Sequence, residues 1–393
     1  MRIKGLRPGL RASRLACLGG LALLVGCGDS ASTGSDKPAD YPRDGALRLN
    51  HIQVLGSHNS YHIQPKPDLF AAIEALVPPL AAAWEYTHLP LDQQFSEQGI
   101  RQIEIDVFAD PDGGLYASRG ATELLTGDGA SGVPDLDAPG LKVLHVQDLD
   151  FESTFWTFVQ GLETIRRWSE ANPTHAPLTI LIEAKDDTID APFDTVIPIP
   201  FDGAQLGVID DEIWSVFEPG HVITPDEVRG DHATLEQAIL QDGWPTLGDS
   251  RGRVLFALDN GGGVKEAYVD GHPSLRGRVL FVSAEPGEDE AAFVKLNDPI
   301  GSFDRIQELV GMGFIVRTRA DGDTEEARTG DTTKRDAAIE SGAQLVSSDY
   351  PVANLDFGTG YFVEIPGGTP GRCNPLSAPA ACDAGDIEHP AAP

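Results

Sequence analysis

The stretch Gln102-Ile-Glu-Ile-Asp-Val-Phe108 has the alternating pattern of a β-strand. Side chains of a strand point alternately to its two faces, so Glu104 and Asp106 share one face and the apolar residues share the other. Two neighbouring carboxylates repel each other unless a cation lies between them or one of them is protonated. The stretch therefore predicts a strand with an apolar face in a core and an acidic face that holds a metal ion.

Seven further stretches have the composition of strands, and several are nearly continuous apolar runs, as expected of strands that are covered on both sides. The eight predicted strands are 52–56, 101–108, 142–146, 178–184, 253–259, 279–284, 314–319 and 344–348. Helical patterns lie between them, at Asp68–Ala83, Phe155–Ala171, Leu235–Gln241, Phe303–Gly311 and Thr333–Ser341. Alternation of strands and helices predicts a parallel sheet.

Eight strand–helix units in about 300 residues predict an α/β fold of the (β/α)8 TIM-barrel type, somewhat distorted and with inserted loops. The predicted insertions are 110–140, rich in Gly, Asp and Pro, and 186–234, which has scattered prolines and acids. The alternative is a doubly wound open sheet, which the strand count disfavours. We expect the barrel to span residues 47–365.

The composition limits the partners that this chain can have. It contains 393 residues, 41% of them hydrophobic, which is enough for a sizeable core. The formal net charge of −32 argues against nucleic acid as a partner, because the phosphate backbone is itself polyanionic. The same charge argues against purely electrostatic docking on anionic lipid.

The N-terminal 26 residues read as a processing segment rather than part of the fold. Five basic residues precede an apolar run, Leu15 to Val25, that is too short to span a membrane. Leu24-Val-Gly-Cys27 then resembles a bacterial lipobox, which predicts lipidation of Cys27. Residues 27–46 are predicted to form a tether, and the protein is expected to be exported and anchored to the cell surface or the periplasmic face of a membrane. An ordinary secretion signal with an incidental cysteine is the alternative.

Export also bears on the two cysteines near the C-terminus. Cys373 and Cys382 lie nine residues apart in a tail, 366–393, that is rich in Pro and Ala. Exported proteins meet an oxidising compartment, so we expect a disulfide between these two residues.

Polar residues gather where the predicted strands end. His58-Asn59 follow the first strand, His145 closes the predicted strand 142–146, and Glu183 closes the next. In a barrel such ends meet at one face, so these residues should join Glu104 and Asp106 in one pocket. Oxygen donors suit Ca²⁺ or Mg²⁺, whereas zinc sites usually hold more His or Cys. Two imidazoles suit acid and base catalysis near neutral pH, so together they suggest metal-assisted phosphodiester chemistry.

Together these motifs resemble the calcium-dependent phosphatidylinositol-specific phospholipase C family, in its secreted bacterial branch. The motifs are GSHNSYH, IEIDVF, LHV and LIE in that order, followed by Arg317–Arg328, Gly330–Thr333 and Ser347–Pro351, and the resemblance covers about residues 48–385. It implies a barrel, a phospholipid or inositol phosphodiester substrate, and Ca²⁺ in preference to Mg²⁺.

The resemblance also implies roles for individual residues. His58 would be the general base and His145 the general acid. The cation would be held by Asn59, Glu104, Asp106 and Glu183. We expect Lys185 near the phosphate, because it shares a face with Glu183, and we expect the inositol hydroxyls to meet Arg319, Asp321 and Tyr350.

The reaction so implied cleaves the glycerol–phosphate bond through a cyclic inositol phosphate. One alternative is a glycerophosphodiester phosphodiesterase, whose first catalytic His is usually followed by Arg-Gly, whereas Asn59-Ser60 follow His58 here. Another is a surface-anchored binding lipoprotein that keeps the barrel without turnover. Such losses usually remove a His or a metal ligand, and none is missing from this sequence.

Overall fold

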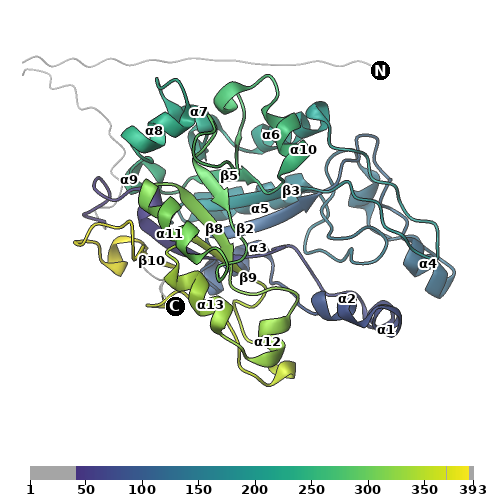
Figure 1. The fold of residues 1–393 in the computed structure, drawn as a ribbon. Coiled ribbons are helices and arrows are strands. Elements are labelled where there is room, and N and C mark those ends of the chain that lie inside the picture. Colours follow the sequence, from purple (N-terminus) through teal and green to yellow (C-terminus); the bar gives the residue numbers. More distant parts are fainter. Residues whose placement is uncertain (1–40, 369, 389–393) are drawn as a thin grey trace, which may run out of the picture. The chain divides into compact units, whose positions relative to one another are not determined.

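A curled sheet of parallel strands forms the centre of the computed structural model, which describes residues 41–368 and 370–388 (Figure 1). Each strand pairs with the next in parallel, β9 pairs back onto β1, and a parallel bridge between Ser283 and Phe293 joins the end of β6 to β7. The predicted TIM-type α/β barrel is therefore confirmed. Its strands are β1 (Ile52–Ser57), β2 (Gln102–Val107), β3 (Leu178–Ala184), β5 (Val254–Leu258), β6 (Leu280–Val282), β7 (Phe293–Lys295), β8 (Ile315–Arg319) and β9 (Leu345–Ser348).

One of the eight predicted strands was wrong. Residues 142–146 form no regular strand, because Lys142 turns back antiparallel onto Phe108 beyond the end of β2, and Val146 bridges Asp150 in a tight loop. The missing barrel strand is instead β7. With only three residues, β7 is too short to show a period of two in the sequence. The strand count was thus right although one member was not.

Helices separate the barrel strands except β6 and β7, and the ends of some predicted helices differ. The predicted helix 68–83 is broken into two at Val77, because Pro78 disfavours helical geometry in the residue before it. No helix among the described residues has the length and apolarity needed to cross a bilayer. The helices are α1 (Pro67–Leu76), α2 (Pro78–Ala83), α3 (Leu91–Glu97), α4 (Gly120–Thr126), α5 (Phe158–Ala171), α6 (Gly203–Val216), α7 (Pro225–Arg229), α8 (Leu235–Gln241), α9 (Leu247–Ser250), α10 (Gly262–Val269), α11 (Phe303–Met312), α12 (Glu325–Thr329) and α13 (Thr333–Glu340).

The two predicted insertions differ from each other. Residues 110–140 form an excursion that carries α4, which Figure 1 shows at one side of the barrel near α1 and α2. Residues 186–234 were expected to be a surface excursion, but α6 within them buries Leu206, Ile209 and Ile213 in the main core. The short strand β4 (Val222–Ile223) also pairs with β5. This segment is therefore part of the barrel wall, and its scattered prolines hid that in the sequence.

Both ends of the described chain pack onto the barrel. The strand β10 (Gly371–Cys373) pairs antiparallel with the first half of β1, and Cys373 forms a disulfide with Cys382. Arg251 contacts Asp44 on the N-terminal side and the carbonyl of Ile387 on the C-terminal side. Residues 41–46, which were assigned to the predicted tether, and the described part of the predicted tail therefore belong to the fold. Cys27 and the signal segment lie outside the described residues.

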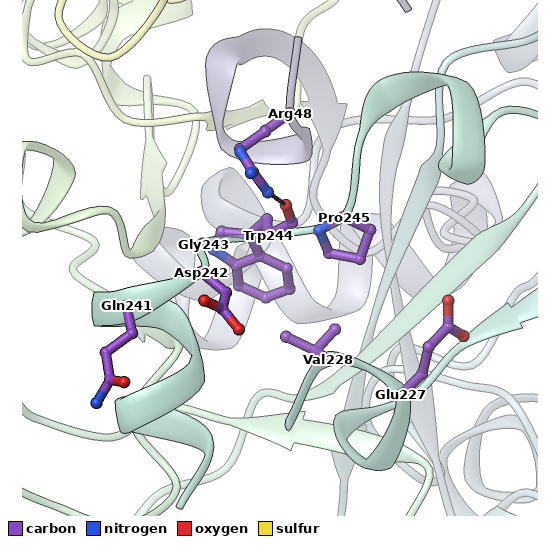
Figure 2. Close-up of a pocket in the computed structure, with 8 residues that line it drawn as sticks. All are labelled: Arg48, Glu227, Val228, Gln241, Asp242, Gly243, Trp244 and Pro245. Carbon is purple, nitrogen blue, oxygen red and sulfur yellow. Dashed lines mark hydrogen bonds between the residues drawn. The ribbon is translucent and has the colours of Figure 1, made fainter. Parts of the chain in front are cut away.

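A hollow of about 450 Å³ lies among residues that precede β1 and β5, away from the strand ends where the site was predicted (Figure 2). Arg48 donates a hydrogen bond to the carbonyl of Trp244 there, and the indole itself is fully buried. None of the predicted site residues lines this hollow. We therefore assign it no part in the chemistry.

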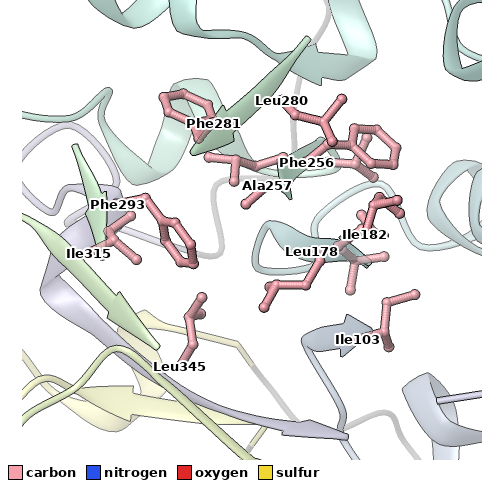
Figure 3. Close-up of a cluster of buried hydrophobic side chains, with 14 of the residues drawn as sticks. Ile103, Leu178, Ile182, Phe256, Ala257, Leu280, Phe281, Phe293, Ile315 and Leu345 are labelled. Carbon is pink, nitrogen blue, oxygen red and sulfur yellow. The ribbon is translucent and has the colours of Figure 1, made fainter. Parts of the chain in front are cut away.

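The core fills the barrel and the layer between strands and helices. Figure 3 shows Ile182 between Ile103 and Phe256, with Leu280 beside Phe256, and Phe293 beside Ile315. The barrel interior narrows at Gly56, where a Cβ atom would lie only 1.9 Å from Oε1 of Gln102. Beyond this tightly packed layer, toward the carboxyl ends of the strands, charged side chains point into the barrel. These side chains form the site.

Candidate active site

His58 directly follows β1 and lies between two charged side chains that are distant from it in the sequence. Its Nδ1 is 2.7 Å from Oδ1 of Asp349, and its Nε2 is 3.3 Å from Nη1 of Arg319. Arg319 Nη2 also donates to Asp349 Oδ2 at 3.0 Å. A carboxylate only accepts and a guanidinium only donates, so Nδ1 carries the proton and the lone pair of Nε2 accepts from Arg319. That tautomer suits a general base.

The surroundings of His58 favour its neutral form. Burial lowers the pKa of His58 to about 3, with a further lowering by the charge of Arg319 and a partial opposition by Asp349. Burial would raise the pKa of Asp349, but the hydrogen bond from His58 and the charge of Arg319 lower it below its usual value. The imidazole is therefore uncharged in the resting site, while 17% of its side chain stays exposed.

His145 lies in the loop after the Phe108–Lys142 bridge, rather than at the end of a strand as predicted. Its Nδ1 is 2.6 Å from Oδ2 of Asp150, and Nε2 of His62 is 2.9 Å from both oxygens of the same carboxylate. Burial of Asp150 opposes its ionisation, but His62 and His145 lower its pKa below the usual value. Asp150 therefore accepts from both imidazoles and leaves Nε2 of His145 available to carry a proton to a substrate.

Two aromatic side chains, Tyr86 and Trp84, lie beside the imidazoles of the site. The Tyr86 ring stacks on His62 at 4.1 Å between centroids and lies 6.4 Å from the ring of His58. Trp84, two residues earlier, meets His145 edge-on at 5.9 Å. The segment at the end of α2 thus places one aromatic ring near the predicted base and another near the predicted acid.

The predicted acidic ligands converge on one end of the barrel. Asp106 and Glu183 are register partners on β2 and β3, and Glu104 lies two residues before Asp106 on the same face of β2. Carboxylate oxygens of Glu104 and Glu183 lie within 4.8 Å of each other and of an oxygen of Asp259, which sequence reasoning did not select. Ligands of Ca²⁺ lie 2.3–2.6 Å from the ion, so oxygens this close can share one.

Basic side chains are interleaved with these acids. Arg317 pairs with Glu104, and Lys295 pairs with Asp259. Lys185 Nζ lies 3.6 Å from Asp106 and 3.5 Å from Glu183. Burial, with the neighbouring acids adding to it, still raises the pKa of Glu104 to about 7 and raises that of Asp106 as well. Both carboxyl groups therefore hold a proton more tightly than a carboxyl group in water does.

Unpartnered oxygen atoms give a test of whether a cation fits. Both carboxylate oxygens of Asp106 and Oδ1 of Asn59 are buried and accept no hydrogen bond in the described part of the chain. Asn59 adopts a left-handed backbone with φ of 44°, and its Nδ2 donates to the Tyr86 hydroxyl at 3.2 Å. Buried oxygens without donors are costly unless a positive charge meets them. The donor set therefore fits a hard divalent ion such as Ca²⁺.

The residues expected near the phosphate or the inositol hydroxyls divide into two groups. Arg319 lies against His58, and Lys185 against the acidic cluster, so both are at the site. Asp321 is fully buried and accepts hydrogen bonds from Ser348 and the backbone of Asp349. Tyr350 is 3% exposed and donates to the carbonyl of Glu85. These two side chains support the loop that carries Asp349, and the structure gives neither a free group for a ligand.

Four site residues were missed. Asp349 stood inside a quoted motif, and its position directly after a strand was the signal that pointed to it. Asp259 is the last residue of the predicted strand 253–259 and directly follows the observed strand β5. Asp150 and His62 approach through loop geometry alone, and nothing in their spacing predicts that they meet.

Comparison with known proteins bears on this arrangement. The family described as Ca²⁺-dependent phosphoinositide phospholipase C matches residues 47–375. No curated protein matches the chain.

Solved structures of similar proteins come from bacteria. A calcium-dependent phosphoinositol-specific phospholipase C from Pseudomonas sp. in its apo form is 15% identical, with a TM-score of 0.51, over 86% of this chain and 99% of that one. Its myoinositol complex is 15% identical, with a TM-score of 0.51, over 86% and 100%. A Ca²⁺-dependent phosphatidylinositol-specific phospholipase C from Streptomyces antibioticus is 16% identical over 78% and 96%, with a TM-score of 0.47. The two Pseudomonas structures support the barrel fold.

Proposed function

This chain belongs to the family of Ca²⁺-dependent phosphoinositide phospholipases C, and from that premise we propose which of its residues act and on which substrate. It is a phosphoric diester hydrolase of the phosphatidylinositol phospholipase C type, and neither the glycerophosphodiesterase nor the non-catalytic alternative is favoured. One observation carries the residue assignment. The unprotonated Nε2 of His58 lies 3.8 Å from Oε1 of Glu104, which places a base beside the acidic cluster.

His58 is the proposed general base. Its Nε2 removes the proton from the inositol hydroxyl next to the phosphate, while Asp349 holds Nδ1 and stabilises the imidazolium that forms. The inositol oxygen then bonds to phosphorus, and the bond from phosphorus to the glycerol oxygen breaks. The result is a cyclic inositol phosphate and a glycerol oxygen that needs a proton.

His145 is the proposed general acid that supplies this proton from Nε2. Asp150 fixes its orientation through Nδ1, and His62 holds Asp150 from the other side. A bound Ca²⁺ would supply positive charge that lowers the pKa of the attacking hydroxyl and offsets charge on the phosphate. Asn59, Glu104, Asp106 and Glu183 are the residues proposed to hold it, and Lys185 adds a positive charge near the phosphate.

The charges at the site support an inositol without further phosphate groups as the head group. Lys185, Lys295, Arg317 and Arg319 are each paired with a carboxylate of the site. An additional phosphate on the ring would meet those same carboxylates. We expect turnover of phosphatidylinositol to exceed turnover of phosphatidylinositol 4,5-bisphosphate in matched vesicles, and equal rates would contradict this choice of head group.

We also propose that the protein is exported and held at a membrane through a lipid on Cys27. The support is the sequence alone, namely a basic start, a short apolar run and the lipobox-like Leu24-Val-Gly-Cys27. Cys27→Ser should release the protein into the soluble fraction. Retention of that variant in the membrane fraction would refute the lipid anchor.

A product assay tests the proposed reaction. Phosphatidylinositol should give a cyclic inositol phosphate and diacylglycerol in the presence of Ca²⁺, and glycerophosphocholine should not be cleaved. His58→Ala should stop turnover while leaving Ca²⁺ binding and the melting curve nearly unchanged. Cleavage of glycerophosphocholine alone would instead support the glycerophosphodiesterase alternative.

A further inference from the structure

We propose that Asp259 is an additional protein ligand of the cation, beyond the four residues predicted from the sequence. The inference rests on the proposed cation site, and it makes that site one with four carboxylates, from β2, β3 and the end of β5, together with Asn59. Lys295 is then the residue that holds Asp259 in place and competes with the ion for it.

The position of Asp259 follows from the sheet register. Ile182 and Leu258 are partners on β3 and β5, and the backbone N–H of Asp259 donates to the carbonyl of Ile182 at 2.8 Å. Asp259 therefore continues the parallel ladder one residue beyond β5, beside Glu183. One carboxylate oxygen from each of Glu104, Glu183 and Asp259 lies within 4.8 Å of the others. Two ligands at 2.3–2.6 Å from a shared Ca²⁺ can be that far apart.

The hydrogen bonding of Asp259 gives an independent sign of a ligand. The residue is only 7% exposed, and its Oδ1 is buried without a hydrogen-bond partner among the described residues. Its other oxygen, Oδ2, is paired with Lys295, whose Nζ also donates to the backbone carbonyl of Asp259 at 2.6 Å. A side chain that is anchored through one oxygen and leaves the other unsatisfied is suited to bind an ion.

The charges of the cluster agree with this assignment. Four carboxylates stand against three basic side chains, which leaves one net negative charge when all are ionised. Glu104 pairs with Arg317, Asp106 and Glu183 share Lys185, and Asp259 pairs with Lys295. A divalent ion turns this excess into a single positive charge, and a phosphodiester group then neutralises the site. Without Asp259, Lys295 would be an unpaired cation next to the ion and would repel it.

Calcium binding to the whole protein without substrate tests the proposal, measured by titration calorimetry. Asp259→Asn should weaken Ca²⁺ binding by about tenfold or more, because the number of charged ligands sets the affinity of such sites. Asp187→Asn is the matched control. It removes the same charge from an exposed position two residues after Lys185, and it should change the affinity less than about twofold by screened electrostatics alone.

Lys295→Met provides a second arm should Asp259→Asn prove too unstable to titrate. Removal of the competing ammonium should strengthen Ca²⁺ binding by about threefold or more if Asp259 is a ligand. Wild-type affinity in both Asp259→Asn and Lys295→Met would overturn the proposal and leave Asp259–Lys295 as a structural ion pair. A wild-type protein that binds no Ca²⁺ would instead overturn the cation site itself, and the inference with it.

Discussion

Replacement of Asp349 by Asn should separate the chemistry of His58 from the stability of the barrel. The carboxylate accepts from Nδ1 of His58 at 2.7 Å and from Arg319 at 3.0 Å. Asparagine keeps the shape of the side chain but loses the charge that stabilises the imidazolium formed during proton transfer. A hydrogen bond to a charged group contributes about 1.5–3 kcal/mol, which corresponds to a fall in kcat of about 10- to 150-fold.

The assay is single-turnover release of cyclic inositol phosphate from phosphatidylinositol vesicles at saturating Ca²⁺. Urea unfolding and calcium titration of the same samples show whether the fold and the cation site persist. Tyr361→Phe is the control, because this buried tyrosine donates to the carbonyl of Ala320 in the same region without contacting His58. If Asp349→Asn lowers kcat less than about threefold, or if Tyr361→Phe lowers it equally, then Asp349 does not act through the imidazole.

Three further predictions concern the acid, the carboxylates and the tail. His145→Ala should greatly lower turnover of phosphatidylinositol but much less that of a p-nitrophenyl ester of inositol phosphate, whose leaving group needs no proton; equal losses would exclude His145 as the acid. Burial raises the pKa of Glu104 from 4.5 to about 7, so the folded protein without Ca²⁺ binds a proton there that the unfolded chain has lost. Stability in chelator should therefore fall as pH rises from about 4.5 to 7, while Ca²⁺ affinity rises over the same interval; calorimetry that finds a pH-independent affinity would contradict this. Cys382→Ser should lower the free energy of unfolding by about 2–3 kcal/mol, because the disulfide closes a short loop. The same change should leave kcat unaltered, and a change in kcat would show that the tail reaches the site.

The sequence predicted the barrel because its longer strands have clear patterns. Residues 102–107 are apolar on one face, and residues 178–184 are apolar almost throughout. Both form strands whose ends lie within a residue of the prediction. The error at 142–146 arose because the same apolar composition fits a loop that folds back on Phe108. The three-residue β7 offered no pattern at all. A periodic pattern of apolar residues indicates which face of a long element is buried. In a stretch of five residues, the pattern cannot distinguish a barrel strand from a buried loop.

The candidate site was predictable as far as it depends on strand ends. Glu104, Asp106 and Glu183 converge because parallel strands bring their carboxyl ends to one face, and His58 lies there for the same reason. His145 reaches the site by a different route, through a hydrogen bond to Asp150 from a loop. Pairings of this kind depend on how loops fold over the barrel, which no local spacing encodes. Asp321 and Tyr350 are buried and hydrogen-bonded to neighbouring segments, because a residue after a strand can also point into the core, and their contact with inositol stays a prediction.

The most direct test of the central claim is a crystal structure with Ca²⁺ bound. We expect one ion in contact with the oxygen atoms of Asn59, Glu104, Asp106 and Glu183, with Nε2 of His58 and Nε2 of His145 facing the same cavity. An ion bound elsewhere, or an imidazole turned away from that cavity, would contradict it.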